Sequence, residues 1–182
     1  MRSMMLYGAP VWASDAMASR RIKQLLRRLE RRMAIRVIRG YRTISYVAVQ
    51  ALAGEIPSNC RLPALFGGFR RSQRWRRSRN SKASPGHIRL ALATWRLELS
   101  SHAGERVAGA LLPHLKRWRE RRHGRLTCRA TQVFTGHGCF GVYLCRIGKE
   151  AAAACHHCGE EEDSAQHTLE ECPAFSSMPN QA

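Results

Sequence analysis

The stretch from Ser19 to Gly40, SRRIKQLLRRLERRMAIRVIRG, determines the predicted fold class. Its apolar side chains recur every three or four residues, which is the spacing of one face of a helix. Ser19 is a preferred N-cap residue, and Gly40 is typical of the position just after a helix. We therefore predict one helix that buries a single apolar stripe, formed by Ile22, Leu25, Leu26, Leu29, Met33 and Val37.

The remaining surface of this predicted helix is strongly basic, and only Glu30 is available to balance its charge. A solvated arginine face is the simplest interpretation. Contact with a phosphate backbone is favoured, because closely spaced cations repel one another unless an anion neutralises them. The predicted nucleic-acid-binding residues are Arg20, Arg21, Lys23, Arg27, Arg28, Arg31, Arg32 and Arg39.

The rest of the 182 residues also favours a mostly α fold, since no alternating pattern is long enough for a sheet. Helical spacing or helix-ending residues mark short helices at 46–53 and 88–99 and several more as far as 147. Residues 58–86 are rich in Arg, Ser and Gly without periodicity, which indicates a flexible basic linker. We predict four segments: a basic helical segment at 1–57, the linker at 58–86, a second small helical region at 87–149, and an acidic metal-binding knuckle at 150–182.

Charge is divided sharply along the chain, whose formal net charge is +18. All 31 Lys and Arg residues lie in residues 1–149, whereas residues 150–182 contain seven of the 13 acidic residues. A basic body of this kind favours RNA or DNA as the partner, although a solvated basic surface or an anionic membrane surface remain alternatives. No apolar run is long enough for a membrane-spanning helix, and seven cysteines without a signal peptide favour a reduced, intracellular setting.

The most specific motif is a set of cysteine and histidine residues near the C-terminus with the spacing C-x2-C-x8-H-x4-C. Zinc binds four such donors tetrahedrally, and three thiolates with one imidazole leave no open position for catalysis. The predicted ligands of a structural Zn²⁺ are Cys155, Cys158, His167 and Cys172. Gly159 permits the tight turn after the first pair, and Ser164 can cap a short helix that carries His167.

Two alternative interpretations of the histidines and cysteines are less favoured. His156 or His157 could replace a ligand, but their place inside the knuckle points them outward. The motif Thr135-Gly136-His137-Gly138-Cys139 places a histidine near a thiol, yet side chains two residues apart seldom face each other, and no acidic residue lies nearby to orient the histidine.

Several stretches resemble the reverse transcriptases of non-LTR retrotransposons, in the region that follows the palm. The N-terminal ones are LYGAPVW (6–12), RRMAIRVIRGYRTISY (31–46) and LAG (52–54). TGHGCF (135–140), YL (143–144) and the knuckle through ECP (171–173) resemble the C-terminal region of the same polyproteins. The resemblance implies that residues 7–53 correspond to the polymerase thumb, which grips the template–primer duplex. It also implies that the four predicted ligands are the family's zinc-knuckle ligands, and that the protein acts in the nucleus.

The sequence departs from this family in two ways. Residues 58–84 lack the family's more acidic helical segment, which suggests a degenerate or frameshifted copy. There is also no Asp-Asp pair, since aspartate occurs only at Asp15 and Asp163, and two-metal nucleotidyl transfer needs converging carboxylates.

We therefore expect a nucleic-acid-binding C-terminal fragment of an RNA-directed DNA polymerase that is not an enzyme on its own. Its expected partners are RNA or DNA, as template–primer or target site, and the upstream polymerase domains, with no membrane partner. The alternative is a zinc-stabilised protein-interaction or autoinhibitory module on a basic RNA-binding body.

Overall fold

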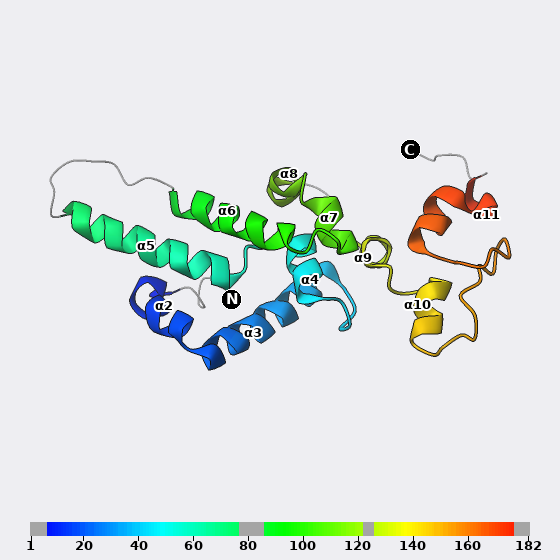
Figure 1. Ribbon diagram of the computed structural model, residues 1–182, viewed down its shortest axis with the longest axis horizontal. Helices are drawn as coiled ribbons and strands as arrows, with labels where there is room; N and C mark the ends of the chain where they lie inside the picture. The colour runs from blue at the N-terminus through cyan, green and yellow to red at the C-terminus, as the bar shows by residue number, and fades with distance from the viewer. Residues whose placement is uncertain (1–6, 77–85, 122–125, 177–182) are drawn as a thin grey trace. The chain divides into compact units, whose positions relative to one another are not determined.

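The computed structural model describes residues 7–76, 86–121 and 126–176, and the prediction of a mostly α fold is confirmed (Figure 1). Within these residues the regular structure is helical, without strands. The elements are α2 (Ala9–Ala18), α3 (Arg20–Ile38), α4 (Tyr46–Ala53), α5 (Ser58–Arg76), α6 (Gly86–Ser100), α7 (Arg106–Leu111), α8 (Leu115–Glu120), α9 (Cys128–Thr135), α10 (Gly141–Arg146), a π-helical turn η1 (His167–Glu171) and α11 (Pro173–Ser176). No helix in the described ranges is long and apolar enough to span a bilayer.

The chain divides into two compact units, which we describe separately. The N-terminal unit consists of the residues up to Ala34 and of Tyr46–Arg121, and the C-terminal unit of Ile35–Ser45 and the residues from Arg122 onward. In the N-terminal unit α5 packs along both α2 and α6, while α7 packs against α4 and α6. The predicted boundaries of the four segments remain predictions.

Helix α2 was not predicted, and it contributes a small apolar core to the N-terminal unit. Gly8 precedes it with a φ of 63°, and a proline stands in its first turn, where a missing N–H costs nothing. Its buried alanines, Ala9 and Ala13, let it approach Leu62 of α5 closely. Larger side chains cover this cluster, namely Trp12, Met17, Leu26, Leu65 and Phe66.

The prediction of a flexible linker at 58–86 is wrong for its first nineteen residues, which form α5. The arginines and serines conceal the spacing of Leu62, Leu65 and Phe66, which fall three and four residues apart and bury one face. The segment also contains no β-branched residue, and Pro63 lies on the exposed side. Residues 77–85 of the predicted linker lie outside the described residues.

Helix α3 lies close to the predicted bounds but buries a different face. Of the predicted stripe, Ile22, Leu25, Leu29 and Val37 are exposed, and only Leu26 and Met33 are half-buried. The buried face instead follows residues four apart, Glu30, Ala34 and Ile38. Each residue turns about 100° around the axis, so the buried face lies roughly 100° from the stripe that apolarity alone indicates.

Glu30, which is 5% exposed, accounts for this difference between the buried face and the apolar stripe. Its carboxylate accepts hydrogen bonds from the Tyr46 hydroxyl at 2.9 Å and from the Ser58 backbone N–H and hydroxyl at 2.8 and 2.5 Å. A buried carboxylate needs such donors. These hydrogen bonds therefore determine which side of α3 faces the interior of the N-terminal unit. The small side chain of Ala34 permits close packing on the same side.

In the C-terminal unit, α9 forms hydrogen bonds with the end of α3 and the residues that follow it. The buried Thr131 hydroxyl donates to the Ile38 carbonyl at 2.5 Å, and the Gln132 amide donates to the Tyr41 hydroxyl at 3.0 Å. Thr127 caps α9 by accepting from the Ala130 N–H at 3.1 Å.

The predicted Ser19 cap of α3, in the N-terminal unit, is present, because the Ile22 N–H donates to the Ser19 hydroxyl at 3.3 Å.

Candidate metal centre

The four residues of the C-x2-C-x8-H-x4-C motif converge in the C-terminal unit. One donor atom from each of Cys155, Cys158, His167 and Cys172 lies within 4.8 Å of the other three. The Cys155 and Cys172 sulfurs are 4.0 Å apart, and the Cys158 sulfur is 3.2 Å from His167 Nε2. Two thiolates bound tetrahedrally at about 2.3 Å lie about 3.8 Å apart, so the group could hold a metal ion.

The first pair of cysteines is held by a tight turn of the backbone. The Gly159 N–H donates to the Cys155 carbonyl at 2.8 Å, and the Cys155 N–H donates to the Glu160 carbonyl at 2.8 Å. Gly159 has a φ of 78°, a left-handed conformation that favours glycine, as the sequence indicated. The turn brings the two sulfurs to the same side of the chain.

The backbone of this turn also favours the thiolate that a metal requires. Burial raises the pKa of the Cys155 thiol, but hydrogen bonds from the His157 and Cys158 backbone N–H groups, and from the His167 and Cys158 side chains, lower it to about 7. Because the thiolate rather than the thiol is the metal ligand, this donor environment suits a cation.

The second pair of ligands flanks the turn η1, which begins at His167 and is followed directly by Cys172. The Ser164 hydroxyl accepts from the His167 N–H at 3.1 Å, so the predicted cap is present, and the Cys172 N–H donates to the His167 carbonyl at 2.7 Å. His167 Nε2 faces Cys158, and its Nδ1 lies 3.8 Å from a Glu171 carboxylate oxygen. A carboxylate beside the second ring nitrogen orients a metal-bound histidine, and the spacing of the motif did not indicate this role for Glu171.

Asp163 ties the ligand segment to α10 and was also not predicted. It is 8% exposed, and its carboxylate accepts from the Gly141 N–H at 2.8 Å and from the Thr168 hydroxyl at 3.1 Å. Its own N–H donates to the Ala153 carbonyl at 2.7 Å. These bonds link the chain before the knuckle, the start of α10, and η1.

We expect Asp163→Ala to weaken metal binding about tenfold, because loss of a supporting partner typically lowers metal affinity 10- to 100-fold. The substitution leaves the Gly141 N–H without its acceptor and releases Thr168, which lies next to the ligand His167. Competition with a chromophoric chelator measures the affinity. Glu162→Ala, one residue away and exposed, is the matched control and should bind metal as the unsubstituted chain does. Equal affinity for both variants would show that Asp163 does not support the site.

The histidines and cysteines outside the motif lie apart from the cluster. His156 is exposed and lies 3.2 Å from a Glu150 oxygen, whereas the His157 ring packs edge-on against Phe175. In the N-terminal unit, the buried Cys60 thiol donates to Glu98 at 3.1 Å, and burial with this carboxylate raises its pKa. The other cysteines, Cys60, Cys128, Cys139 and Cys145, do not belong to the cluster.

The eight predicted nucleic-acid-binding residues lie on α3 and at its end. Seven are exposed and Arg31 is half-buried. The Arg27 guanidinium lies over the Tyr46 ring, 4.4 Å from its centroid, and Arg39 follows the helix with a φ of 52°. At about 100° per residue, Arg21, Arg28 and Arg32 fall within about 40° of one another around the axis, and we call these three residues the arginine row.

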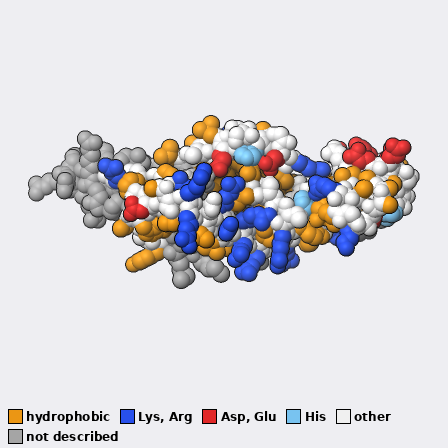
Figure 2. All heavy atoms as spheres, turned by 60° about the horizontal axis from the view of Figure 1, so that its bottom comes forward, with side chains coloured by type: hydrophobic (Ala, Val, Ile, Leu, Met, Phe, Trp, Pro, Cys, Tyr) orange, Lys and Arg blue, Asp and Glu red, His pale blue; other side chains and the backbone are white. Residues whose placement is uncertain are grey.

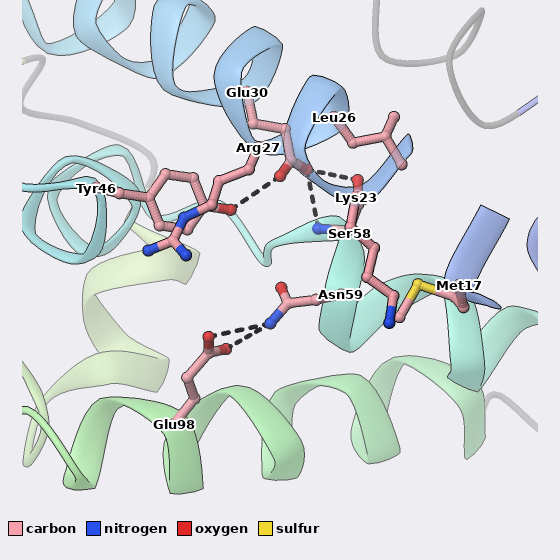
Figure 3. A pocket seen from close by; sticks show the side chains of 9 residues that line it. All are labelled: Met17, Lys23, Leu26, Arg27, Glu30, Tyr46, Ser58, Asn59 and Glu98. Carbon is pink, nitrogen blue, oxygen red and sulfur yellow. Dashed lines mark hydrogen bonds between the residues drawn. The ribbon is translucent and has the colours of Figure 1, made fainter. Parts of the chain in front are cut away.

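A cavity of about 170 Å³ opens beside this helix in the N-terminal unit (Figure 3). Glu30, Tyr46 and Ser58 form its upper wall, and the Asn59 amide donates to both Glu98 oxygens at 3.0 Å. Lys23 and Arg27 also line it. The basic sequence around Glu30 favours a surface counter-charge at this position, whereas the structure buries it. As the one acidic residue within a basic helix, it could have been recognised as a buried anchor.

Comparison with known proteins finds similarity to a retrotransposon polyprotein. The chain is 28% identical, over 185 aligned positions, to the "Retrovirus-related Pol polyprotein from type-1 retrotransposable element R1 4" of Nasonia vitripennis. The alignment covers 93% of this chain and 45% of that polyprotein, so the chain spans less than half of its relative's length. No protein-family model matches, and no solved structure matches. The similarity supports an origin in a retrotransposon polyprotein.

Proposed function

We propose that this chain is the nucleic-acid-binding C-terminal part of a retrotransposon polyprotein, stabilised by a structural zinc ion and without polymerase chemistry of its own. The catalytic carboxylates would belong to other parts of the parent protein, and the site of action would be the nucleus. The observation that carries the proposal is the inward orientation of Glu30. The one acidic residue of α3 is buried on the side of the helix opposite Arg21, Arg28 and Arg32, and within the described residues it forms no ion pair with these three arginines.

The donor set supports zinc as the metal. Three thiolates and a neutral imidazole are soft or borderline donors, which suit Zn²⁺ rather than Ca²⁺ or Mg²⁺. Cys155, His167 and Cys172 are buried, and all four donors are protein side chains. A closed site of this kind contributes folding energy and provides no open coordination position for a reaction.

The arginine row supports phosphate contact. Figure 2 shows Lys and Arg side chains gathered on the face that carries α3. A rise of about 1.5 Å per residue places Arg28 about 10 Å from Arg21 along the axis, and Arg32 about 6 Å further. In the described residues no acidic group forms an ion pair with Arg21, Arg28 or Arg32. Neutralising phosphates and releasing their counterions would relieve the repulsion within this row.

Replacement of Arg21, Arg28 and Arg32 by Gln tests this proposal. We expect the triple variant to lose duplex affinity about tenfold or more at low salt, and to reduce the slope of log K against log salt by about 3, one for each lost contact. Fluorescence anisotropy with a labelled duplex measures both quantities.

The matched control replaces Arg89, Arg96 and Lys116 by Gln, which changes the net charge equally at exposed positions on α6 and α8. We expect this control to lose little affinity. Equal losses in the two triple variants would mean that overall charge, and not α3, accounts for binding.

A further inference from the structure

The motif Thr135–Cys139 has no part in the metal site, yet its backbone is tightly specified within the C-terminal unit. Gly136 ends α9 in the left-handed region with a φ of 64°, and Gly138 has a φ of 114°. A Cβ at Gly138 would lie 2.8 Å from the Gln132 side chain, so the loop tolerates only glycine there. The two glycines thus permit the backbone turns on either side of His137.

His137 belongs to a cluster of three aromatic rings. Its ring is nearly parallel to that of Tyr41, at 20° and with the centroids 6.2 Å apart, and it lies 4.7 Å from the ring of Tyr143. The Arg146 guanidinium lies 5.3 Å from the Tyr143 centroid. Tyr143 is 7% exposed and forms the back of the cluster, whereas Tyr41 is 38% exposed and His137 is half-buried. The cluster therefore presents an aromatic face to solvent beside a cation.

Hydrogen bonds hold these rings in defined orientations. The Gln132 amide donates to the Tyr41 hydroxyl, and His137 Nδ1 lies 2.9 Å from the Thr135 carbonyl. A carbonyl partner requires a proton on Nδ1, which leaves Nε2 of the neutral ring as an acceptor. Burial also lowers the pKa of His137, which favours the neutral ring. The face thus combines fixed rings with a hydrogen-bond acceptor.

We propose that Tyr41, His137 and Tyr143, with Arg146, form a stacking site for an unpaired base of single-stranded nucleic acid. Aromatic side chains bind single strands by stacking on bases, whose flat faces all resemble one another, and neighbouring arginines add cation–π contacts. His137 Nε2 can accept a hydrogen bond from an exocyclic amino group. This inference rests on the proposed nucleic-acid binding, but it concerns a different unit of the chain from α3.

The test compares two single strands that carry the same phosphates. One is a short oligonucleotide with all its bases, and the other has abasic residues at its central positions. We expect the zinc-loaded chain of 182 residues to bind the complete strand about tenfold more tightly than the abasic one, because stacking is lost without bases. Fluorescence anisotropy measures both affinities.

Substitutions then locate the preference. Tyr41→Leu should abolish most of the preference for the complete strand without changing the affinity for the abasic strand. Tyr41→Phe keeps the ring and should retain the preference. The matched control is Tyr7→Leu, which removes a tyrosine that is 85% exposed in the other unit and should have no effect.

The outcomes separate the two proposals. Equal binding of both strands by the unsubstituted chain overturns the stacking site but leaves phosphate binding intact. Binding of neither strand, nor of duplex, overturns both proposals. If Tyr41→Leu fails to fold, the strand comparison on the unsubstituted chain still decides whether bases contribute.

Discussion

Replacing Cys172 by Ser should remove the metal from the protein and unfold the segment that contains the ligands. Cys172 is 2% exposed, and its sulfur lies 4.0 Å from that of Cys155. A serine hydroxyl is a poor ligand for a metal that selects thiolates, and structural zinc contributes folding energy directly. The affinity should therefore fall by more than the roughly 10- to 100-fold that loss of an outer-sphere partner causes.

Metal content by elemental analysis and thermal unfolding together measure this effect. We expect about one metal ion per unsubstituted chain, close to none in Cys172→Ser, and loss of the unfolding transition of the C-terminal unit. Cys139→Ser is the matched control, because Cys139 is exposed and lies outside the cluster. Full metal content in Cys172→Ser would contradict the proposed ligand set.

Replacing Glu30 by Ala should destabilise the N-terminal unit by about 3 kcal/mol, because it leaves several buried donors without their acceptor. The Tyr46 hydroxyl and both donors of Ser58 bond to this one carboxylate. Burial and the neighbouring Glu30 carboxylate raise the pKa of Tyr46, so its hydroxyl stays protonated and donates. Urea unfolding, followed by circular dichroism, measures the loss.

Two further variants distinguish the network from a general effect of charge. Tyr46→Phe removes one of the three hydrogen bonds and should cost about 1 kcal/mol. Glu120→Ala removes an exposed carboxylate and should change stability by less than about 0.5 kcal/mol. If Glu30→Ala were no more damaging than Glu120→Ala, the buried network would not determine which face of α3 packs.

The sequence predicted best those features that depend on neighbouring residues. Helix α4 has the predicted bounds, because its apolar run is followed by Gly54 and Pro57, which end a helix. The four metal ligands lie within eighteen consecutive residues, so their spacing alone indicates that they converge. The caps at Ser19 and Ser164 were also predictable, since a cap acts within three residues.

Features that depend on distant partners could not be predicted in this way. The rotation of α3 depends on Ser58, which is 28 residues from Glu30, and a helical stripe of leucines gives no sign of it. The role of Asp163 depends on Gly141, which is 22 residues away. Helix α5 was missed for another reason. Its few apolar residues are interspersed with arginines and serines, and they are buried only by packing against α2 and α6.

Burial of Glu30 removes the single acidic residue of α3 from the exposed face of that helix. A surface carboxylate on this basic helix would reduce what the helix gains by binding an anion. The structure instead places the Glu30 carboxylate inside the unit. The exposed apolar residues of the same helix, Ile22, Leu25 and Leu29, lie beside the arginine row rather than beneath it. Phosphate contact through α3 therefore needs no rearrangement of the helix.

The dependence of duplex affinity on salt concentration, measured with the zinc-loaded chain, tests the central proposal most directly. If exposed arginines neutralise phosphates, log K should fall linearly with log salt with a slope of about −0.9 per contact, and hence about −3 or steeper for the arginine row together with its neighbours. A slope near zero, or no binding at low salt, would contradict the proposal that this chain binds nucleic acid.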